Sequence, residues 1–228
     1  MSVISAVDVH FAYGATVALT GMTFDGRAGE AVAVVGQSGS GKSTLLRCLA
    51  GLQVPKSGQV CFEGKDLYAL GDKARSAVRL AHFGFVFQSA ELISELTLLE
   101  NIALPVELNG MKRRQSLRTA TAWAERLGID ECMERRPRHV SGGQRQRAAI
   151  ARAMATTPKV VFADEPTGAL DSHNRDSVLE LLVGSCETAG CLLVLVTHDP
   201  VAADRASRVV HMVDGREAEA RDLSAVSR

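Results

Sequence analysis

The sequence predicts an α/β fold with a mostly parallel β-sheet. Short apolar runs at residues 31–35, 160–163, 191–196 and 209–213 are typical of buried strands. Patterns typical of helices separate the middle strands, and this alternation favours βα units. A glycine-rich loop, an acidic pair and a histidine each follow one of these strands. Because ligands of such sheets bind at the carboxyl ends of the strands, these polar groups are expected to meet at one edge.

The remaining regions are expected to differ from this core. Residues 3–10 alternate partly and glycines punctuate the following segment, so short antiparallel strands are expected there. Residues from about 91 to 138 are expected to be helical, with a stop at Gly128. One face of that helical region is marked by Leu117, Ala120, Ala124 and Leu127. The tail from Arg216 onward is polar and is expected to fray.

The glycine-rich loop fits the pattern GxxxxGK[ST] in full. It joins the strand at 31–35 to a helix whose apolar face includes Leu45, Cys48, Leu49 and Leu52, with Gly51 near its end. Glycines allow backbone N–H groups to turn inward around phosphates, and the helix N-terminus favours an anion. Lys42 is expected to reach the β- and γ-phosphates, and Ser43 to ligate Mg²⁺. The predicted phosphate-binding residues are Gly36, Ser38, Gly39, Ser40, Gly41, Lys42, Ser43 and Thr44.

An acidic pair ends the strand at 160–163. Asp164 suits coordination of Mg²⁺, directly or through water. Glu165 is placed to polarise an attacking water and is the predicted catalytic base. Beside a phosphate-binding loop, this pair predicts hydrolysis of a nucleoside triphosphate.

A second phosphate-binding device opens another helix. Ser141 is followed by two glycines and Gln144, which presents a hydroxyl and bare amides at a helix start. One nucleotide scarcely needs two such devices from one chain. The second is therefore expected to act on the nucleotide of a neighbouring subunit.

The segments SGGQRQRAAIARAM, VVFADEP and GALD together resemble the ABC ATPase family, and the resemblance covers almost the whole chain. It implies a P-loop NTPase core of the RecA-like type, with an N-terminal antiparallel β subdomain. It also implies a helical subdomain, at about 89–140, inserted into one domain of residues 1–228. Two copies are expected to form a homodimer that holds two ATP molecules with Mg²⁺ between them.

The resemblance also implies roles for single residues. Tyr13 resembles the aromatic that stacks on adenine, with Phe11 a weaker substitute. Gln88 resembles the residue that contacts Mg²⁺ and water and senses the permease. His198 resembles the switch histidine at the γ-phosphate, and with Glu165 and Lys42 completes the predicted catalytic set. The residues implied to act across the dimer are Ser141, Gly143, Gln144 and Asp171.

Two positions depart from the family pattern. Val140 stands where Leu is usual at the start of the signature segment, residues 140–144, and Gly168 stands where Ser is common at the start of the D-loop, residues 168–171. Neither change removes a catalytic group. Both ATP sites of the homodimer are therefore expected to hydrolyse ATP.

The stretch after Gln88 resembles a subfamily. The segments LISELT at 92–97, Glu100-Asn101 and Leu104-Pro105 are similar to the cassettes of macrolide exporters and lipoprotein-release systems. Peptide-resistance pumps, haem-efflux pumps and the cell-division pair share the pattern. This resemblance implies a bacterial exporter ATPase at the cytoplasmic face of the membrane, bound to a separate transmembrane permease. The cargo stays open between haem, an antimicrobial peptide, a macrolide and a lipoprotein.

Other functions compete with this one. A regulatory ATPase that drives cell-wall remodelling without transport would carry the same motifs. A soluble ABC ATPase of DNA repair or translation would carry a coiled-coil insertion or a second cassette, and neither is present in 228 residues. A P-loop kinase would need neither SGGQ nor the switch histidine.

Composition narrows the class further. Lys plus Arg equals Asp plus Glu at 26 each, so nothing indicates a nucleic-acid partner. The five cysteines are odd in number and form no CxxC pair, which favours reduced thiols over disulfides or a metal site. The N-terminus has no signal-peptide pattern, and the apolar run at 191–196 is far shorter than the ~20 residues of a membrane span.

Overall fold

The computed structural model describes residues 2–218 of the chain. Within that range the strands form two sheets, one of six strands in the order β10-β9-β3-β8-β7-β6 and one of four strands in the order β2-β1-β4-β5. The larger sheet contains β3 (Ala31–Val35), β6 (Phe83–Phe87), β7 (Val160–Asp164), β8 (Leu192–Val196), β9 (Arg208–Val213) and β10 (Arg216–Glu217). Its first five strands are parallel to their neighbours, and β10 is antiparallel to β9. The predicted α/β class with a mostly parallel sheet is confirmed.

Strand β6 was not among the predicted strands. It reads FGFVF, and the glycine interrupts the apolar run. Gly84 has a packing reason, because a Cβ there would lie 2.6 Å from the carbonyl oxygen of Ala153 on the adjoining helix. The strand forms the edge of the sheet and ends immediately before Gln88.

The smaller sheet is antiparallel and lies at the N-terminal side of the core. It contains β1 (Ser2–Tyr13), β2 (Thr16–Arg27), β4 (Ser57–Phe62) and β5 (Lys65–Asp66). Antiparallel strands are therefore present near the N-terminus as predicted, but β1 and β2 have 12 residues each and are not the short strands that were expected. Strand β1 pairs with β4 although the phosphate loop, residues 36–43, and the first helix lie between them in the sequence. No local pattern indicated this pairing.

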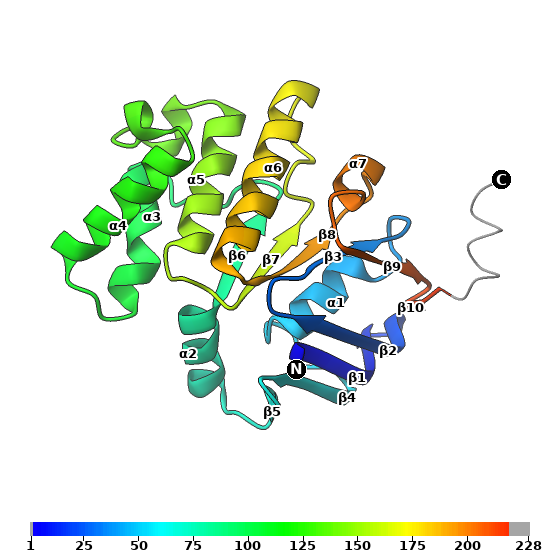
Figure 1. The fold of residues 1–228 in the computed structure, drawn as a ribbon. Coiled ribbons are helices and arrows are strands. Elements are labelled where there is room, and N and C mark those ends of the chain that lie inside the picture. The colour runs from blue at the N-terminus through cyan, green and yellow to red at the C-terminus, as the bar shows by residue number, and fades with distance from the viewer. Residues whose placement is uncertain (1, 219–228) are drawn as a thin grey trace.

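Helix α1 (Lys42–Leu49) lies between the two sheets, and the longer helices α5 (Gly142–Met154) and α6 (Ser172–Ala189) cover the opposite face of the larger sheet (Figure 1). One apolar cluster joins α1 to both sheets, and the other joins the far face of the larger sheet to α5, α6 and the helical segment between β6 and α5. The predicted α1 face is correct at Leu45, Cys48 and Leu49, which are buried. It is wrong at Leu52, because the helix ends at Leu49 and Leu52 is 46% exposed.

The segment between β6 and α5 holds α3 (Leu98–Leu108), α4 (Arg113–Arg126) and two short 3₁₀ turns, Asp130–Cys132 and Pro137–His139. Ala120 and Ala124 are fully buried, as the predicted face requires, and Gly128 takes a left-handed φ of 65° after the helix. Residues 91–97 are not helical, contrary to expectation. Their backbone is held instead by Asn101, whose amide donates to the carbonyl oxygens of Ile93 and Thr97 at 3.0 and 2.8 Å.

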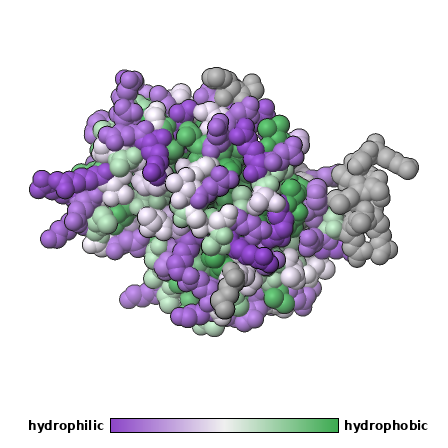
Figure 2. Space-filling model, in the orientation of Figure 1, coloured by the Kyte–Doolittle hydropathy of each residue, from purple (hydrophilic) through white to green (hydrophobic). Residues whose placement is uncertain are grey.

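The described part of the chain has two further helices, α2 (Asp72–His82) before β6 and α7 (Pro200–Ala203) after β8. Residues 216–217 form β10, so the polar tail begins as a strand, while its part at 219–228 lies outside the described residues. Hydrophilic side chains predominate on the face drawn in Figure 2, and hydrophobic ones form small separate patches. Within residues 2–218 no helix has the length and hydropathy that crossing a bilayer requires.

Candidate active site

The phosphate loop runs from the carboxyl end of β3 to the start of α1. Gly41 precedes the helix with a φ of 99°, and a Cβ there would lie 2.3 Å from the carbonyl oxygen of Ala18. Only glycine fits that combination of backbone angle and close approach. No side chain caps α1, so the amides of its first turn face the loop without a side-chain acceptor.

Lys42 folds back across the loop. Its ammonium donates to the carbonyl oxygens of Gly36 and Gln37, both at 2.8 Å. Burial lowers the pKa of this ammonium, and the carboxylates of Glu165 and Asp164 oppose that shift. The side chain is therefore pre-positioned with its charge facing both the loop and the acidic pair.

Ser43 and Asp164 come together although they are far apart in the sequence. The Ser43 hydroxyl donates to a carboxylate oxygen of Asp164 at 2.9 Å, across the space between α1 and β7. A hydroxyl beside a carboxylate is an oxygen donor set that suits Mg²⁺. Gln88 lines the same hollow as Ser43, Asp164 and Glu165, so the predicted metal-binding residues share one space.

Glu165 and His198 form a hydrogen-bonded pair. One carboxylate oxygen of Glu165 lies 2.7 Å from Nδ1 of His198. Glu165 has a φ of 48°, and its N–H donates to the carbonyl oxygen of Val196 at 2.9 Å, which ties the end of β7 to the end of β8. Both side chains line the cavity, of about 640 Å³, that also contains Lys42, Ser43 and Thr44.

Tyr13 lies at the rim of that cavity. Tyr13 is 46% exposed, and its ring is flanked edge-on by Phe11, with a centroid separation of 4.8 Å. Its hydroxyl donates to Gln53 at 2.9 Å, which fixes the ring at the edge of the phosphate loop. An exposed ring in this position offers a flat face to a base.

The second predicted phosphate-binding device lies elsewhere. Ser141 caps α5 in a reciprocal capping box with Gln144, through hydrogen bonds of 3.2 and 2.9 Å. Neither residue is among those that line the cavity around Lys42, and Ser141 is exposed. Their action on a second subunit's nucleotide stays a prediction.

Gly143 and Asp171 meet at one side chain. A Cβ at Gly143 would lie 2.8 Å from the amide oxygen of Asn174, and the amide nitrogen of Asn174 donates to Asp171 at 2.7 Å. Asp171 also caps α6 by accepting from the Asn174 N–H at 3.0 Å. The start of α5 and the start of α6 are thereby linked.

Gly168, which replaces the serine common in the family, packs against the side chain of Gln88. A Cβ at this position would lie 2.9 Å from the side-chain nitrogen of Gln88. The absent side chain therefore leaves room for Gln88 beside the D-loop.

Three residues to which the sequence assigned no role in the site hold the segment around Gln88. Gln146 is 2% exposed and donates to the carbonyl oxygen of Phe87 at 2.9 Å. Arg152 donates to the carbonyl oxygens of Ala90 and Glu91 at 2.9 and 2.6 Å. Asn101 holds the following turn, as described above. A polar residue on the apolar face of a predicted helix was the available signal at Gln146.

A family model for the ABC transporter matches residues 19–168. The chain belongs to this family. As a member it is an ATP-hydrolysing cassette that uses ATP and Mg²⁺. The groups of this structure that suit that chemistry are the phosphate loop, the Ser43–Asp164 pair and the Glu165–His198 pair.

The chain is similar to several curated proteins over most of its length. It is 42% identical over 201 residues to the lipoprotein-releasing system ATP-binding protein LolD of Chromohalobacter salexigens, covering 88% of this chain and 85% of LolD. It is 44% identical over 198 residues to the uncharacterized ABC transporter ATP-binding protein YbbA of Escherichia coli K12, covering 87% of each chain. It is also 44% identical to the macrolide export ATP-binding/permease protein MacB of Shigella boydii, but there the match spans 30% of MacB.

A solved structure confirms the fold. The ATP-binding cassette MJ0796, in a dimeric post-hydrolysis state bound to ADP and Pi, superposes with a TM-score of 0.86 at 33% identity. The match covers 95% of this chain and 97% of MJ0796.

Proposed function

We propose that this cassette powers a separate membrane-spanning permease that exports a hydrophobic or amphipathic compound. The observation that carries the ATP-driven part is the meeting of Lys42, the Ser43–Asp164 pair and the Glu165–His198 pair at one edge of the larger sheet. The similarity to LolD and MacB supports the exporter part, and a haem, an antimicrobial peptide, a macrolide and a lipoprotein all stay open as cargo.

Each predicted site residue has a role in this proposal. The phosphate loop and Lys42 bind the triphosphate, and Tyr13 stacks on the base. Ser43, Asp164 and Gln88 would hold Mg²⁺, which when bound neutralises charge on the phosphate oxygens. Glu165 accepts the proton of the attacking water, and His198 holds that carboxylate in place.

We further propose that one domain of residues 1–228 carries a helical subdomain at about 89–140, and that two copies form a head-to-tail dimer. In that dimer Ser141, Gly143 and Gln144 of one copy contact the nucleotide of the other, and Asp171 acts across the interface. The dimeric state of the similar cassette MJ0796 supports this arrangement. Closure of the dimer would shift the helical subdomains, and hydrolysis would reset them.

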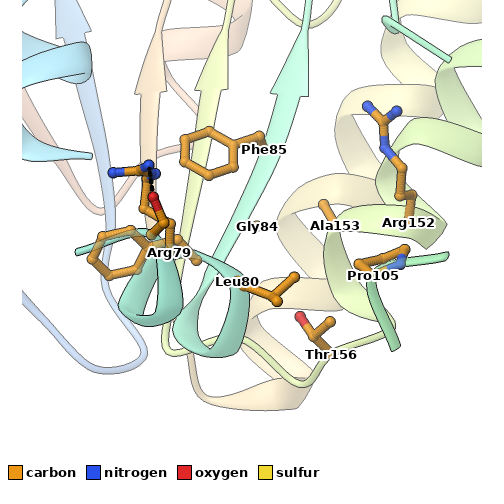
Figure 3. Close-up of a pocket in the computed structure, with 10 residues that line it drawn as sticks. Arg79, Leu80, Gly84, Phe85, Pro105, Arg152, Ala153 and Thr156 are labelled. Atoms are coloured by element: carbon orange, nitrogen blue, oxygen red, sulfur yellow. Dashed lines mark hydrogen bonds between the residues drawn. The ribbon is translucent and has the colours of Figure 1, made fainter. Parts of the chain in front are cut away.

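A second hollow offers a place for the permease. It has a volume of about 340 Å³ and lies between α2, β6, α3 and α5, with Leu80 and Phe85 on one side and Pro105 and Arg152 on the other (Figure 3). Arg152 lines this hollow and also holds the two residues after Ser89 through their carbonyl oxygens. A permease segment in this hollow would therefore touch the residue that fixes the Gln88 segment. In this proposal the cassette works at the cytoplasmic face of a bacterial cell membrane.

The test is a pull-down of the tagged cassette from its own cells in mild detergent, with partners identified by mass spectrometry. A membrane protein with few spans and a large extracellular domain is the expected partner. The pull-down is repeated with Leu80→Glu, which puts a charge into the second hollow. This variant should lose the partner, while the isolated variant cassette keeps its ATPase rate. Recovery of soluble proteins alone would refute the permease proposal and leave the ATPase standing.

A cell-wall regulator is the alternative that shares these motifs. A partner that binds a wall hydrolase, together with no movement of any cargo in reconstituted vesicles, would favour that function.

A further inference from the structure

The junction between α6 and β8 brings two cysteines together. After α6 ends at Ala189, Gly190 takes a left-handed φ of 64°. The Gly190 N–H donates to the Glu187 carbonyl oxygen at 3.0 Å, and the Cys191 N–H donates to the Cys186 carbonyl oxygen at 3.1 Å. These two hydrogen bonds form the Schellman motif, which is frequently accompanied by a contact between the side chains of the two residues that the longer bond joins. In this chain both of those side chains are thiols.

A backbone hydrogen bond holds the two cysteines near the separation that a disulfide spans. Because one backbone hydrogen bond joins them directly, bond lengths limit the separation of their Cα atoms to about 7 Å. Disulfides span about 4.4–6.8 Å between Cα atoms. The Cys191 sulfur also lies 3.6 Å from the carbonyl oxygen of Cys186, so its side chain turns toward the helix end.

The surroundings give the two thiols different reactivity. Hydrogen bonding with the Cys186 thiol lowers the pKa of Cys191, although burial opposes the shift. The same interaction and burial raise the pKa of Cys186. Burial raises the pKa of Cys48 to about 12 and also raises that of Cys132. Cys191 is therefore the thiol that ionises first at this junction.

We propose that Cys186 and Cys191 are a redox modification site, which hydrogen peroxide converts into an intramolecular disulfide. The Cys191 thiolate attacks one peroxide oxygen, the O–O bond breaks, and Cys191 becomes a sulfenic acid while hydroxide leaves and takes up a proton. The Cys186 sulfur then attacks the Cys191 sulfur, its own proton is released, and a second hydroxide leaves as water. Two thiols and one peroxide thus give one disulfide and two waters.

The position of the pair suits such a modification. Both side chains are buried, but the four residues between them, 187–190, are exposed. A local opening of this helix end would admit a small peroxide without unfolding the sheet. The pair lies at the amino end of β8, whereas His198 follows its carboxyl end. The inference therefore does not depend on the proposed export function.

Differential alkylation of the full chain tests the proposal. The protein is treated with hydrogen peroxide, denatured in iodoacetamide, reduced, and alkylated with N-ethylmaleimide before peptide mass spectrometry. Cys186 and Cys191 are expected to lose the first label together and to gain the second, and dithiothreitol before denaturation should restore the first. Cys132 is a matched control, because it is buried with its thiol 3.4 Å from the Ile129 carbonyl oxygen but faces no second thiol.

Single variants assign the order of the steps. In Cys186→Ser the sulfenic acid on Cys191 should persist and react with dimedone, whereas in Cys191→Ser the remaining Cys186 should stay reduced. Differential alkylation of the wild-type protein tests the disulfide even if a variant folds poorly. Unchanged labelling of Cys186 and Cys191 after peroxide, or a disulfide that joins either one to Cys48, Cys61 or Cys132, would overturn the proposal.

Discussion

Glu165 stands in a backbone conformation that few residues other than glycine adopt. Its φ of 48° lies in the left-handed region, which costs of the order of 1–3 kcal/mol for a residue with a side chain. The strain is held by the hydrogen bond from its N–H to Val196 and by the contact of its carboxylate with His198. This posture aims the carboxylate into the cavity that contains Lys42.

Replacing Glu165 with Gln removes the proton acceptor and keeps the shape. We expect ATP binding to persist and turnover to fall by about 10²–10⁴, the usual contribution of a general base. A filter-binding assay and a phosphate-release assay measure the two quantities.

Glu63 provides a matched control for this substitution. It has the same φ of 48° but is exposed at the end of β4, so Glu63→Gln should hydrolyse ATP normally. Near-normal turnover by Glu165→Gln would show that another group is the base.

At the scale of elements, the start of α3 is fixed by a reciprocal cap. The Thr97 hydroxyl accepts from the Glu100 N–H at 3.1 Å, and the Glu100 carboxylate accepts from the Thr97 N–H at 3.0 Å. The cap sets where the helix begins, after the non-helical segment that follows Gln88. The packing of α3 against α4 and α5 depends on that starting point.

Thr97→Ala is expected to destabilise the protein by about 1 kcal/mol through loss of the cap. In a chain of this size that corresponds to a fall in Tm of roughly 2–4 °C. Thermal unfolding followed by circular dichroism measures it. Thr188→Ala removes an exposed hydroxyl that bonds within α6 at the Gly184 carbonyl oxygen, so an equal fall there would contradict the capping explanation.

Hydrogen bonds accepted by one carboxylate join the starts of β3 and β9. Glu30 accepts from Arg208 at 2.8 Å and from the Arg27 N–H at 2.9 Å. Burial raises the pKa of Glu30, but these hydrogen bonds and the two arginine charges outweigh it and hold the pKa below its ordinary value of 4.5. A lowered pKa stabilises the fold above the unfolded value, and that stabilisation is lost as the pH falls through the folded value.

The Tm of the wild type is therefore expected to fall more steeply than that of Glu30→Gln as the pH drops below about 4.5. The two curves should run parallel between pH 6 and 8, where the carboxylate stays ionised. Differential scanning calorimetry across this range is the measurement. Parallel curves over the whole acid range would mean that Glu30 does not carry the effect.

For the whole molecule, the larger sheet separates two apolar clusters. One side carries α1 and the antiparallel sheet, and the other carries α5, α6 and the segment with α3 and α4 (Figure 1). The cavity with Lys42 opens beside α1, whereas Ser141 begins α5. This separation within one chain is the geometric basis for the proposed dimer.

Ser141→Arg in the Glu165→Gln background tests that dimer. We expect ATP to dimerise the Glu165→Gln chain and to leave the double variant monomeric, because a bulky charge would occupy the space of the partner's nucleotide. ATP binding by the monomer should be unchanged. Size-exclusion chromatography with light scattering reads the mass, and Thr188→Arg, at an exposed site near the end of α6, should still dimerise.

The sequence alone determined the local structure of the short segments on which the predicted chemistry rests. The phosphate loop, Asp164 with Glu165, and Ser141 with Gln144 could be predicted because each is a strand end or a helix start whose geometry depends on neighbours in the chain. The α/β class followed from the same local patterns. The end of α1 before Leu52 was missed, because Tyr68 and Arg79, from later in the chain, bond the carbonyl oxygens of Cys48 and Gly51 there. The non-helical residues 91–97 were missed because side-chain bonds from Asn101 and Arg152 hold their backbone in place of helical bonds.

Only the tertiary structure decided which segments meet. The strand order places Asp164 beside Ser43, puts the unpredicted β6 at the sheet edge, and pairs β1 with β4 across the phosphate loop. It also brings Arg152 to Ala90 and Glu91, and Glu165 to His198. These contacts join residues far apart in the chain, and local periodicity carries no information on such pairings because packing of the complete core selects them.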